Sequence, residues 1–301
     1  MKKLYKNNLV LKKEIKYELF LLPALIGFTL FFIYPVLCSF YYSTTNWSLY
    51  NNDSFKFIGL QNFNKILDDV EVYSGIFNSF KWALLVTFFH NTLAIPLAVA
   101  LDSKIKGKNF FRSVFFVPAV LSSLIVGYLW NFIMAPTDYG LLNKVITFFG
   151  GHNVNWLGEP KIALYSVLFT QIWQWTGWTM IIYLANLQSI PSDYYEAAEI
   201  DGANGWKKFK VITLPMLAPS MTVNLLLSMI GGLKVFDIIF SMTQGGPGHA
   251  TETIITILIK RGFSEGLYGY ASAIGVVLFL IIAVVSLILL KFLIRREEKI
   301  I

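Results

Sequence analysis

Long stretches without any charged side chain dominate the pattern of hydrophobic and polar positions along the chain. A helix rises about 1.5 Å per residue, so about 20 such residues are enough to cross roughly 30 Å of hydrocarbon. The pattern therefore predicts six membrane-spanning helices. Their expected ranges are 19–42, 80–101, 111–134, 163–187, 217–241 and 268–292.

The composition agrees with a chain whose main solvent is the lipid bilayer. Hydrophobic residues make up 55% and charged residues 14%, whereas an ordinary soluble domain has about 25% charged residues. This balance excludes a disordered chain and argues against reading the net charge of +7 as a nucleic-acid-binding surface. The single cysteine, Cys38, has no partner for an internal disulfide and is expected to pack as a small hydrophobic residue.

The distribution of Lys and Arg predicts the orientation, because short cytoplasmic loops carry an excess of both. An orientation with both termini inside places most of the 25 Lys and Arg residues on the cytoplasmic face. The first apolar run is longer than the core of a signal peptide, so we expect an uncleaved span. The predicted organisation is listed from the N-terminus: cytoplasmic tail 1–18 with a helix that lies on the membrane or a solvated tail, first span 19–42, outer loop 43–79, five-helix core 80–292 and cytoplasmic tail 293–301.

The connection between the fourth and fifth spans, residues 189–216, contains a short helix with the features of a docking element. Ser192 or Asp193 can cap its N-terminus, and acidic residues in the first turn suit the helix dipole. Gly202 ends the helix, and two adjacent alanines allow another surface to approach its backbone. A solvated connection without a partner is the alternative interpretation.

Residues in this connection also resemble a known family. The series Glu196-Ala197-Ala198, Gly202, Ile212 and Leu214-Pro215 is similar to the EAA loop in membrane-spanning subunits of bacterial ABC importers, and Asp201 and Ala203 strengthen the likeness. A second stretch, residues 236–247 with 269–273, resembles the carbohydrate-uptake branch. The resemblance implies an all-α membrane protein with the type I ABC importer permease fold, located as a multi-pass protein in the bacterial cytoplasmic membrane.

The resemblance also implies partners. We expect a second homologous permease subunit, two ATPase subunits that bind ATP and Mg, an extracellular solute-binding protein and a sugar substrate. Glu196 would anchor a coupling helix in the ATPase, Ala197 and Ala198 would pack closely and Gly202 would provide the turn. The chain itself lacks a phosphate-binding loop, because Asp102 and Asn109 stand where the motif around Gly107-Lys108 needs glycine and a hydroxyl. We therefore expect no enzymatic activity, cofactor or metal in this chain.

The fourth and fifth spans carry residue types that suit a sugar-binding cavity. Aromatic rings pack on the apolar face of a sugar and amides pair with its hydroxyls. Gln171, Gln174, Trp175 and Trp178 are spaced to share one helix face, although an aromatic belt at the membrane interface is the alternative. The candidates on the fifth span are Ser228, Gly231, Gly232 and the i, i+3 pair Lys234 and Asp237. Prolines such as Pro118 and Pro219 are expected to kink their spans.

A secondary transporter driven by an ion gradient is the rival hypothesis. Ionisable groups at membrane depth are costly and often functional, so Lys234, Asp237 and His90 could form a relay. For His90, a neutral imidazole bonded within the bundle is the simpler interpretation, and a substrate or proton role is the alternative. The rival needs no EAA loop, and it predicts uptake that stops with an uncoupler rather than with ATP depletion.

Overall fold

The computed structural model describes residues 20–51, 55–103, 105–137 and 139–298. The predicted tail 1–18, with its helix along the membrane, lies outside the described residues. The described chain is nearly all helical, and its β-type pairing is a single bridge between Thr45 and Phe57. The described residues form two compact units, unit 1 within residues 20–66 and 261–277 and unit 2 within residues 67–260 and 278–298.

Unit 1 contains the first apolar helix, Phe20–Ser43, which includes the π-helical turn η1 (Thr29–Ile33) and α2 (Tyr34–Ser43). Its side chains are exposed or half-buried as far as Tyr42, as expected of a helix that faces lipid. The short helix η2 (Leu49–Asn51) and the start of α3 (Gln61–Asp68) follow. The Leu49 amide donates to the Gly266 carbonyl at 2.7 Å, which joins this segment to residues 261–277.

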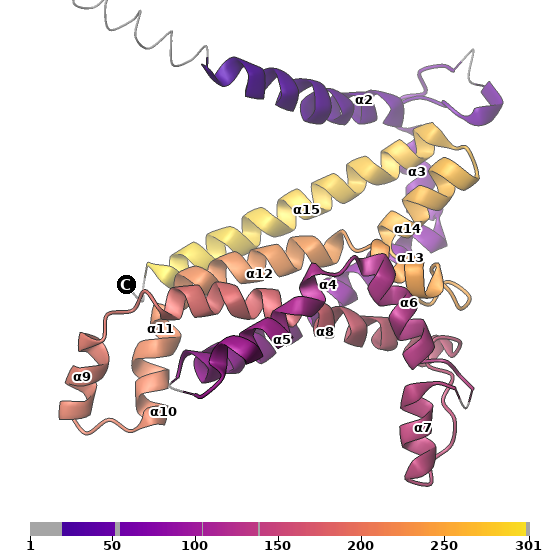
Figure 1. The fold of residues 1–301 in the computed structure, drawn as a ribbon. Coiled ribbons are helices and arrows are strands. Elements are labelled where there is room, and N and C mark those ends of the chain that lie inside the picture. Colours follow the sequence, from indigo (N-terminus) through magenta and orange to yellow (C-terminus); the bar gives the residue numbers. More distant parts are fainter. Residues whose placement is uncertain (1–19, 52–54, 104, 138, 299–301) are drawn as a thin grey trace, which may run out of the picture. The chain divides into compact units, whose positions relative to one another are not determined.

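Unit 2 is organised around α4 (Val70–Asp102), which packs against α8 (Pro160–Leu187) and α12 (Ala218–Leu233) (Figure 1). One apolar cluster includes Trp82 from α4 and Leu168 from α8, and a second includes Tyr183. The C-terminal part of α15 (Tyr268–Glu297) packs on α4 and α12 through residues such as Ile282. These clusters hold the three helices that surround the cavity described below.

The expected third span is broken, and a second sharp bend lies at the start of the expected fifth span. α5 (Lys108–Val120) and α6 (Ser123–Ile133) meet at an angle of 100°. Pro118 lies just before this break, where its missing N–H and its ring weaken the helix. The segment Gly205–Met216, made of α10 (Gly205–Lys208), η3 (Phe209–Thr213) and α11 (Leu214–Met216), meets α12 at 65°. Pro219 lies in the first turn of α12, where proline is favourable because its fixed φ is helical and an N–H at this position has no partner within the helix.

Three described helices are long and apolar enough to cross a membrane unbroken, and the two bent pairs bring the number to five. The remaining predicted span is the fourth, 163–187, where α8 has 28 residues, but the amides and indoles of α8 lower its hydropathy. Six spans with both termini inside therefore stay a prediction. The expected fifth span, 217–241, consists of two helices. The first, α12, ends at Leu233, and the second, α13 (Asp237–Thr243), begins three residues after Lys234. The helix α14 (Ile254–Ile259) follows in the chain.

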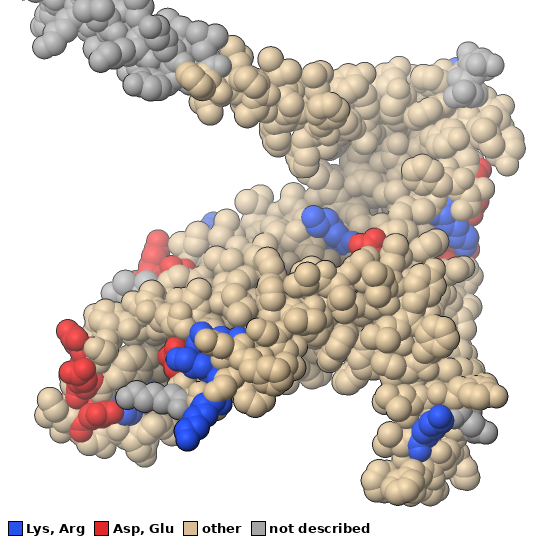
Figure 2. Space-filling view, in the orientation of Figure 1, with Lys and Arg blue, Asp and Glu red and all other residues tan. Residues whose placement is uncertain are grey.

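Charged side chains are unevenly distributed over unit 2. On the face shown in Figure 2, acidic and basic residues gather at the end that carries α9 (Asp193–Ile200) and α10, whereas the surface along the long helices is largely uncharged. A broad uncharged surface beside a charged end is typical of a protein that leaves the bilayer at that end.

Candidate functional site

The short helix α9 and the segment after it form a tight turn between α8 and α12. After Ile200 the chain adopts a left-handed conformation at Gly202, with φ of 70°. The Gly202 amide donates to the Glu199 carbonyl at 3.0 Å and the Ala203 amide to the Ala198 carbonyl at 2.8 Å. This is the Schellman arrangement, which suits glycine because a Cβ is unfavourable at positive φ. The sequence therefore specifies where α9 stops.

The segment that begins with α9 and ends with α10, residues 192–208, is named here the α9–α10 hairpin. At its start, Ser192 occupies the N-cap position, but its side chain makes no capping bond. The Asn204 side chain caps α10 by accepting from the Lys207 amide at 2.9 Å. The Tyr195 hydroxyl lies 3.1 Å from the Thr213 hydroxyl and ties α9 to η3. An eight-residue helix is marginal alone, so these contacts hold it in place.

An ion pair also crosses the hairpin. Lys208 Nζ lies 2.7 Å from Glu199 Oε1. The hydrogen bond and the charge of Lys208 lower the pKa of Glu199, so this carboxyl stays ionised at neutral pH. Because Glu199 is largely exposed, the pair contributes little stability.

The outward surface of the α9–α10 hairpin lacks a covering layer. No α9 residue is buried, and Ile200 is 88% and Trp206 72% exposed. Glu196 and Ala197 are exposed, and Ala198 is half-buried. Exposed apolar side chains beside a small-residue surface are typical of an interaction site. The predicted residues Glu196, Ala197 and Gly202 thus lie on one accessible element.

A cavity of about 420 Å³ lies within unit 2, between α4, α8 and α12. Eight of the residues predicted for a substrate cavity line it: Gln171, Trp175, Trp178, Ser228, Gly231, Gly232, Lys234 and Asp237. Its walls combine indole rings, an amide, a hydroxyl and one charge of each sign. Such a surface can pack on an apolar ring face and bond hydroxyl groups.

Two predictions about this region are wrong. Gln174 is fully buried and does not line the cavity; its Nε2 donates to the Leu121 carbonyl at 3.0 Å, at the break between α5 and α6. A broken helix frees carbonyl groups, and Gln174 satisfies one of them. Lys234 and Asp237 are not an i, i+3 pair on one helix, because Lys234 caps the end of α12 and Asp237 begins α13.

Several cavity residues were not predicted as substrate contacts. Asn224 and Thr179 line the cavity and bond one another, since Asn224 Nδ2 donates to the Thr179 carbonyl at 3.3 Å. His90, for which a substrate or proton role was the alternative to a structural bond, also lines the cavity, and its Nε2 lies 3.4 Å from the Gln171 carbonyl oxygen. The four-residue spacing of Asn224 and Ser228 was the available signal, because it places both polar side chains on one face of α12.

Close helix packing fixes the cavity walls. A Cβ added at Gly177 in α8 would lie 1.8 Å from the Phe115 carbonyl oxygen of α5. One added at Gly232 in α12 would lie 2.6 Å from the Ala83 Cα of α4. Both glycines therefore let two helix backbones approach one another. Trp178, beside Gly177, stacks on Phe116 with ring centroids 5.9 Å apart.

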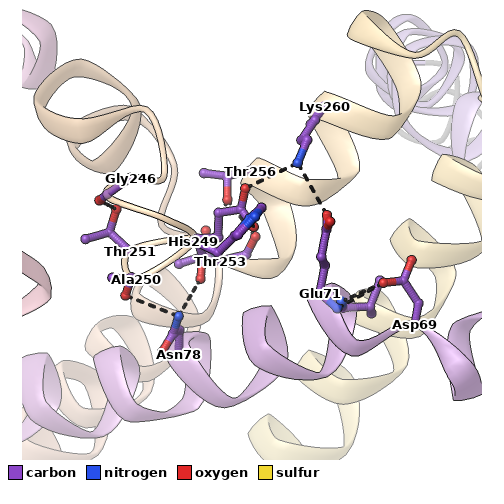
Figure 3. Close-up of polar contacts among 12 residues, drawn as sticks. Asp69, Glu71, Asn78, Gly246, His249, Ala250, Thr251, Thr253, Thr256 and Lys260 are labelled. Carbon is purple, nitrogen blue, oxygen red and sulfur yellow. Dashed lines mark hydrogen bonds and ion pairs between the residues drawn. The ribbon is translucent and has the colours of Figure 1, made fainter. Parts of the chain in front are cut away.

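A polar cluster joins the loop after α13 to the start of α4 (Figure 3). Glu71, His249 and Glu252 offer ligand atoms within 4.8 Å of one another, a donor set that suits a divalent cation. However, Lys260 Nζ lies 3.3 Å from Glu71 and 3.6 Å from Glu252, so both carboxylates already face a cation. Asn78 adds a bond from Nδ2 to the Glu252 carbonyl at 2.9 Å. We interpret the cluster as an ion-pair network that holds the loop.

Comparisons with known proteins agree with this arrangement. A family model described as a binding-protein-dependent transport system inner membrane component matches residues 91–299. A probable starch degradation products transport system permease protein of Thermoanaerobacterium thermosulfurigenes is 34% identical over 95% of this chain and 96% of its own. A trehalose/maltose transport system permease protein of Thermococcus litoralis is 34% identical over 95% of this chain and 97% of its own.

A third relative and a solved structure extend the comparison. A multiple sugar-binding transport system permease protein of Streptococcus mutans is 36% identical over 90% of this chain and 93% of its own. The crystal structure of a bacterial ABC transporter involved in the import of the acidic polysaccharide alginate contains a chain that matches with a TM-score of 0.82. That match covers 99% of both chains at 24% identity, and it shows the fold alone.

Proposed function

Because the chain belongs to the family of binding-protein-dependent transport system inner membrane components, we propose that it is the permease subunit of an ABC importer for a sugar or an oligosaccharide. An extracellular solute-binding protein delivers the substrate, and separate ATPase subunits drive its movement. The proposal rests on the α9–α10 hairpin, because its exposed residues form a docking element that an ATPase subunit can bind.

Coupling follows from the connectivity of the hairpin. It joins α8, which carries Gln171, Trp175 and Trp178, to α12, which carries Ser228 and Gly231. Both helices line the cavity, so a displacement of α9 is transmitted to two of its walls. Rigid elements transmit such a shift better than flexible loops, because a packed core resists continuous deformation.

The segment that joins the hairpin to α12 is anchored in the core. Leu217, between α11 and α12, is fully buried in the cluster that includes Ala94 and Tyr183. A push on α9 therefore acts on the 65° bend before α12 rather than on a loose linker. Within the proposal, Glu196 and Asp201 meet polar groups of the ATPase, Ala197, Ala198 and Ala203 pack against it, and Gly202 shapes the turn.

The rest of the importer is supplied by other chains. One permease subunit provides one coupling element, so a second homologous permease subunit and two ATPase subunits complete the machine. ATP and Mg are bound by the ATPase subunits. ATP binding draws the two coupling elements together, and the cavity changes from inward-facing to outward-facing, a shift that the docked solute-binding protein favours.

A sugar is the substrate class that the cavity suits best. Trp175 and Trp178 supply ring faces, Gln171 and Asn224 supply amides, and Ser228 supplies a hydroxyl. This mixture matches a ligand with apolar faces and many hydroxyl groups. The names of the relatives, which refer to starch degradation products, to trehalose and maltose and to multiple sugars, support the same class.

One observation favours the rival hypothesis of a secondary transporter: His90, Lys234 and Asp237 all line the cavity. The family match and the EAA pattern favour the ABC importer. Energetics separate the two, because an importer driven by ATP keeps working when the ion gradient is collapsed.

Reconstitution tests the proposal. The chain is assembled in liposomes with a second permease, the ATPase and the binding protein, and a panel of sugars is supplied outside. We expect at least one sugar, together with its binding protein, to stimulate ATP hydrolysis and to accumulate inside, with an uncoupler having no effect. Uptake that needs a proton or sodium gradient and ignores ATP would refute it.

A further inference from the structure

The helix α7 (Leu141–Phe148), between α6 and α8, presents an apolar surface away from the protein. This surface, named here the α7 face, consists of Leu141, Lys144, Val145, Phe148 and Phe149. Phe148 is 85% and Phe149 81% exposed, and their rings contact one another with centroids 5.4 Å apart. A surface helix in water exposes mainly polar residues, whereas α7 exposes Leu141, Val145 and Phe148 beside Lys144 and Thr147.

The α7 face is held in a fixed position. Asn143, on the opposite side of the helix, is fully buried, and its side chain forms four hydrogen bonds with three residues. Its Nδ2 donates to the Ala135 carbonyl at 2.9 Å and to the Val154 carbonyl at 3.0 Å, and its Oδ1 accepts from the Val154 amide at 3.0 Å. The Trp156 indole N–H also donates to Oδ1, at 3.2 Å. The exposed aromatic residues therefore belong to an ordered element rather than to a loose loop.

The α7 helix also lies close to helices that enter the bilayer. Ala135, which Asn143 contacts, directly follows the last turn of α6, and Trp156 lies just before the start of α8 at Pro160. In Figure 1, α7 runs across the direction of α8, at the end of unit 2 opposite to α9. A helix in this place lies roughly parallel to the membrane surface, on the side away from the α9–α10 hairpin.

We infer that α7 is an interfacial anchor whose aromatic face inserts into the lipid leaflet opposite to the α9–α10 hairpin. Three features identify lipid as the occupant. In the chain α7 lies between α6 and α8, Asn143 holds it at the ends of these two helices, and the only charged side chain of the α7 face is Lys144 at the edge. A lysine at the rim of an apolar stripe reaches lipid phosphates while its stem stays in the boundary region. Phenylalanine and leucine are typical of such helices.

This anchor goes beyond the transport function proposed above. Because Asn143 links α7 to the ends of α6 and α8, lipid contact would set the depth of the broken span and of the helix that carries Trp175 and Trp178. A soluble partner or the second permease subunit would instead shield the same face by protein.

Spin-label accessibility distinguishes these environments. Single cysteines replace Val145 or Phe148 in a Cys38→Ser background, and His152, an exposed residue of the following loop, provides the matched aqueous control. Each complete importer is reconstituted in liposomes, and the nitroxide is exposed to oxygen, which partitions into lipid, and to a water-soluble nickel chelate. We expect the oxygen-to-nickel accessibility ratio at positions 145 and 148 to exceed that at position 152 by about threefold or more.

Two outcomes overturn the inference. Equal ratios at all three positions would show that water covers the α7 face, and low accessibility to both reagents at positions 145 and 148 would show that a protein covers it. Val145→Cys is a small change at an exposed site, so it reports on the face even if Phe148→Cys disturbs assembly. The ATP hydrolysis of each labelled complex confirms that it is assembled.

Discussion

Substitution of Gly177 by alanine tests whether the close contact of α5 and α8 sets the cavity wall. The added Cβ would lie 1.8 Å from the Phe115 carbonyl oxygen and 2.5 Å from the carbonyl carbon. These atoms belong to the backbone of α5, so no side-chain rotation relieves the overlap. The two helices must separate locally, and Trp178 moves with α8.

The expected magnitude follows from two opposing effects. Overpacking a close contact costs about 3 kcal/mol at the upper end of the usual range. Replacing glycine by alanine inside a helix stabilises the helix by about 1 kcal/mol. The net loss is about 2 kcal/mol, which corresponds to a decrease of roughly 4–8 °C in Tm for a domain of this size class.

Thermal unfolding of the purified protein in lipid nanodiscs measures this loss. Gly27→Ala is the matched control, because Gly27 is also inside a helix of a predicted span and a Cβ there meets nothing within 4 Å. We expect the control to keep or slightly raise Tm, while Gly177→Ala lowers Tm and weakens the apparent sugar affinity in the ATP hydrolysis assay. Equal Tm values for both variants, with unchanged sugar affinity, would refute the packing argument.

Three further predictions concern the break in the third span and the α9–α10 hairpin. Gln174→Leu removes the bond to the Leu121 carbonyl and should cost about 1 kcal/mol in thermal unfolding, with unchanged apparent sugar affinity, since Gln174 does not line the cavity. Gly202→Val should reduce ATP-driven uptake because a β-branched residue at φ of 70° costs about 1–2 kcal/mol, whereas Gly202→Asn should retain more uptake. Lys208→Ala should raise the pKa of Glu199 toward its ordinary range in a carboxyl NMR titration. In the wild-type protein the ion pair is fully formed at pH values above the ordinary pKa range of a glutamate. It is lost only when the pH falls through the lowered pKa of Glu199, because the carboxylate is then protonated.

Most of the helical architecture could be predicted from where charges are missing. The ends of α8 and the start of α15 lie close to the expected ranges 163–187 and 268–292. The break at Leu121 and the stop at Leu233 were missed, because a hydropathy pattern counts side chains and ignores backbone hydrogen bonds. Pro118 and Pro219 indicated kinks, but they did not give the angles.

The candidate cavity was only partly predictable. Residue types in the fourth span identified Gln171, Trp175 and Trp178, because rings and amides at helical spacing have a clear chemical meaning. Gln174 has the same residue type as Gln171, yet it bonds the freed backbone of α5, and only the packing of that helix decides this. Asn224 was missed because a single amide in an apolar helix is also typical of a structural bond.

The central claim is that α9 lies on the cytoplasmic side and is gripped by the ATPase, and labelling of one cysteine tests it most directly. Ala197, which is exposed on α9, is replaced by cysteine in the Cys38→Ser background. A membrane-impermeant maleimide is applied to vesicles of either orientation, with and without the ATPase. The account predicts labelling only from the cytoplasmic face and protection once the ATPase binds. Labelling from the outer face, or equal labelling with the ATPase bound, would contradict it.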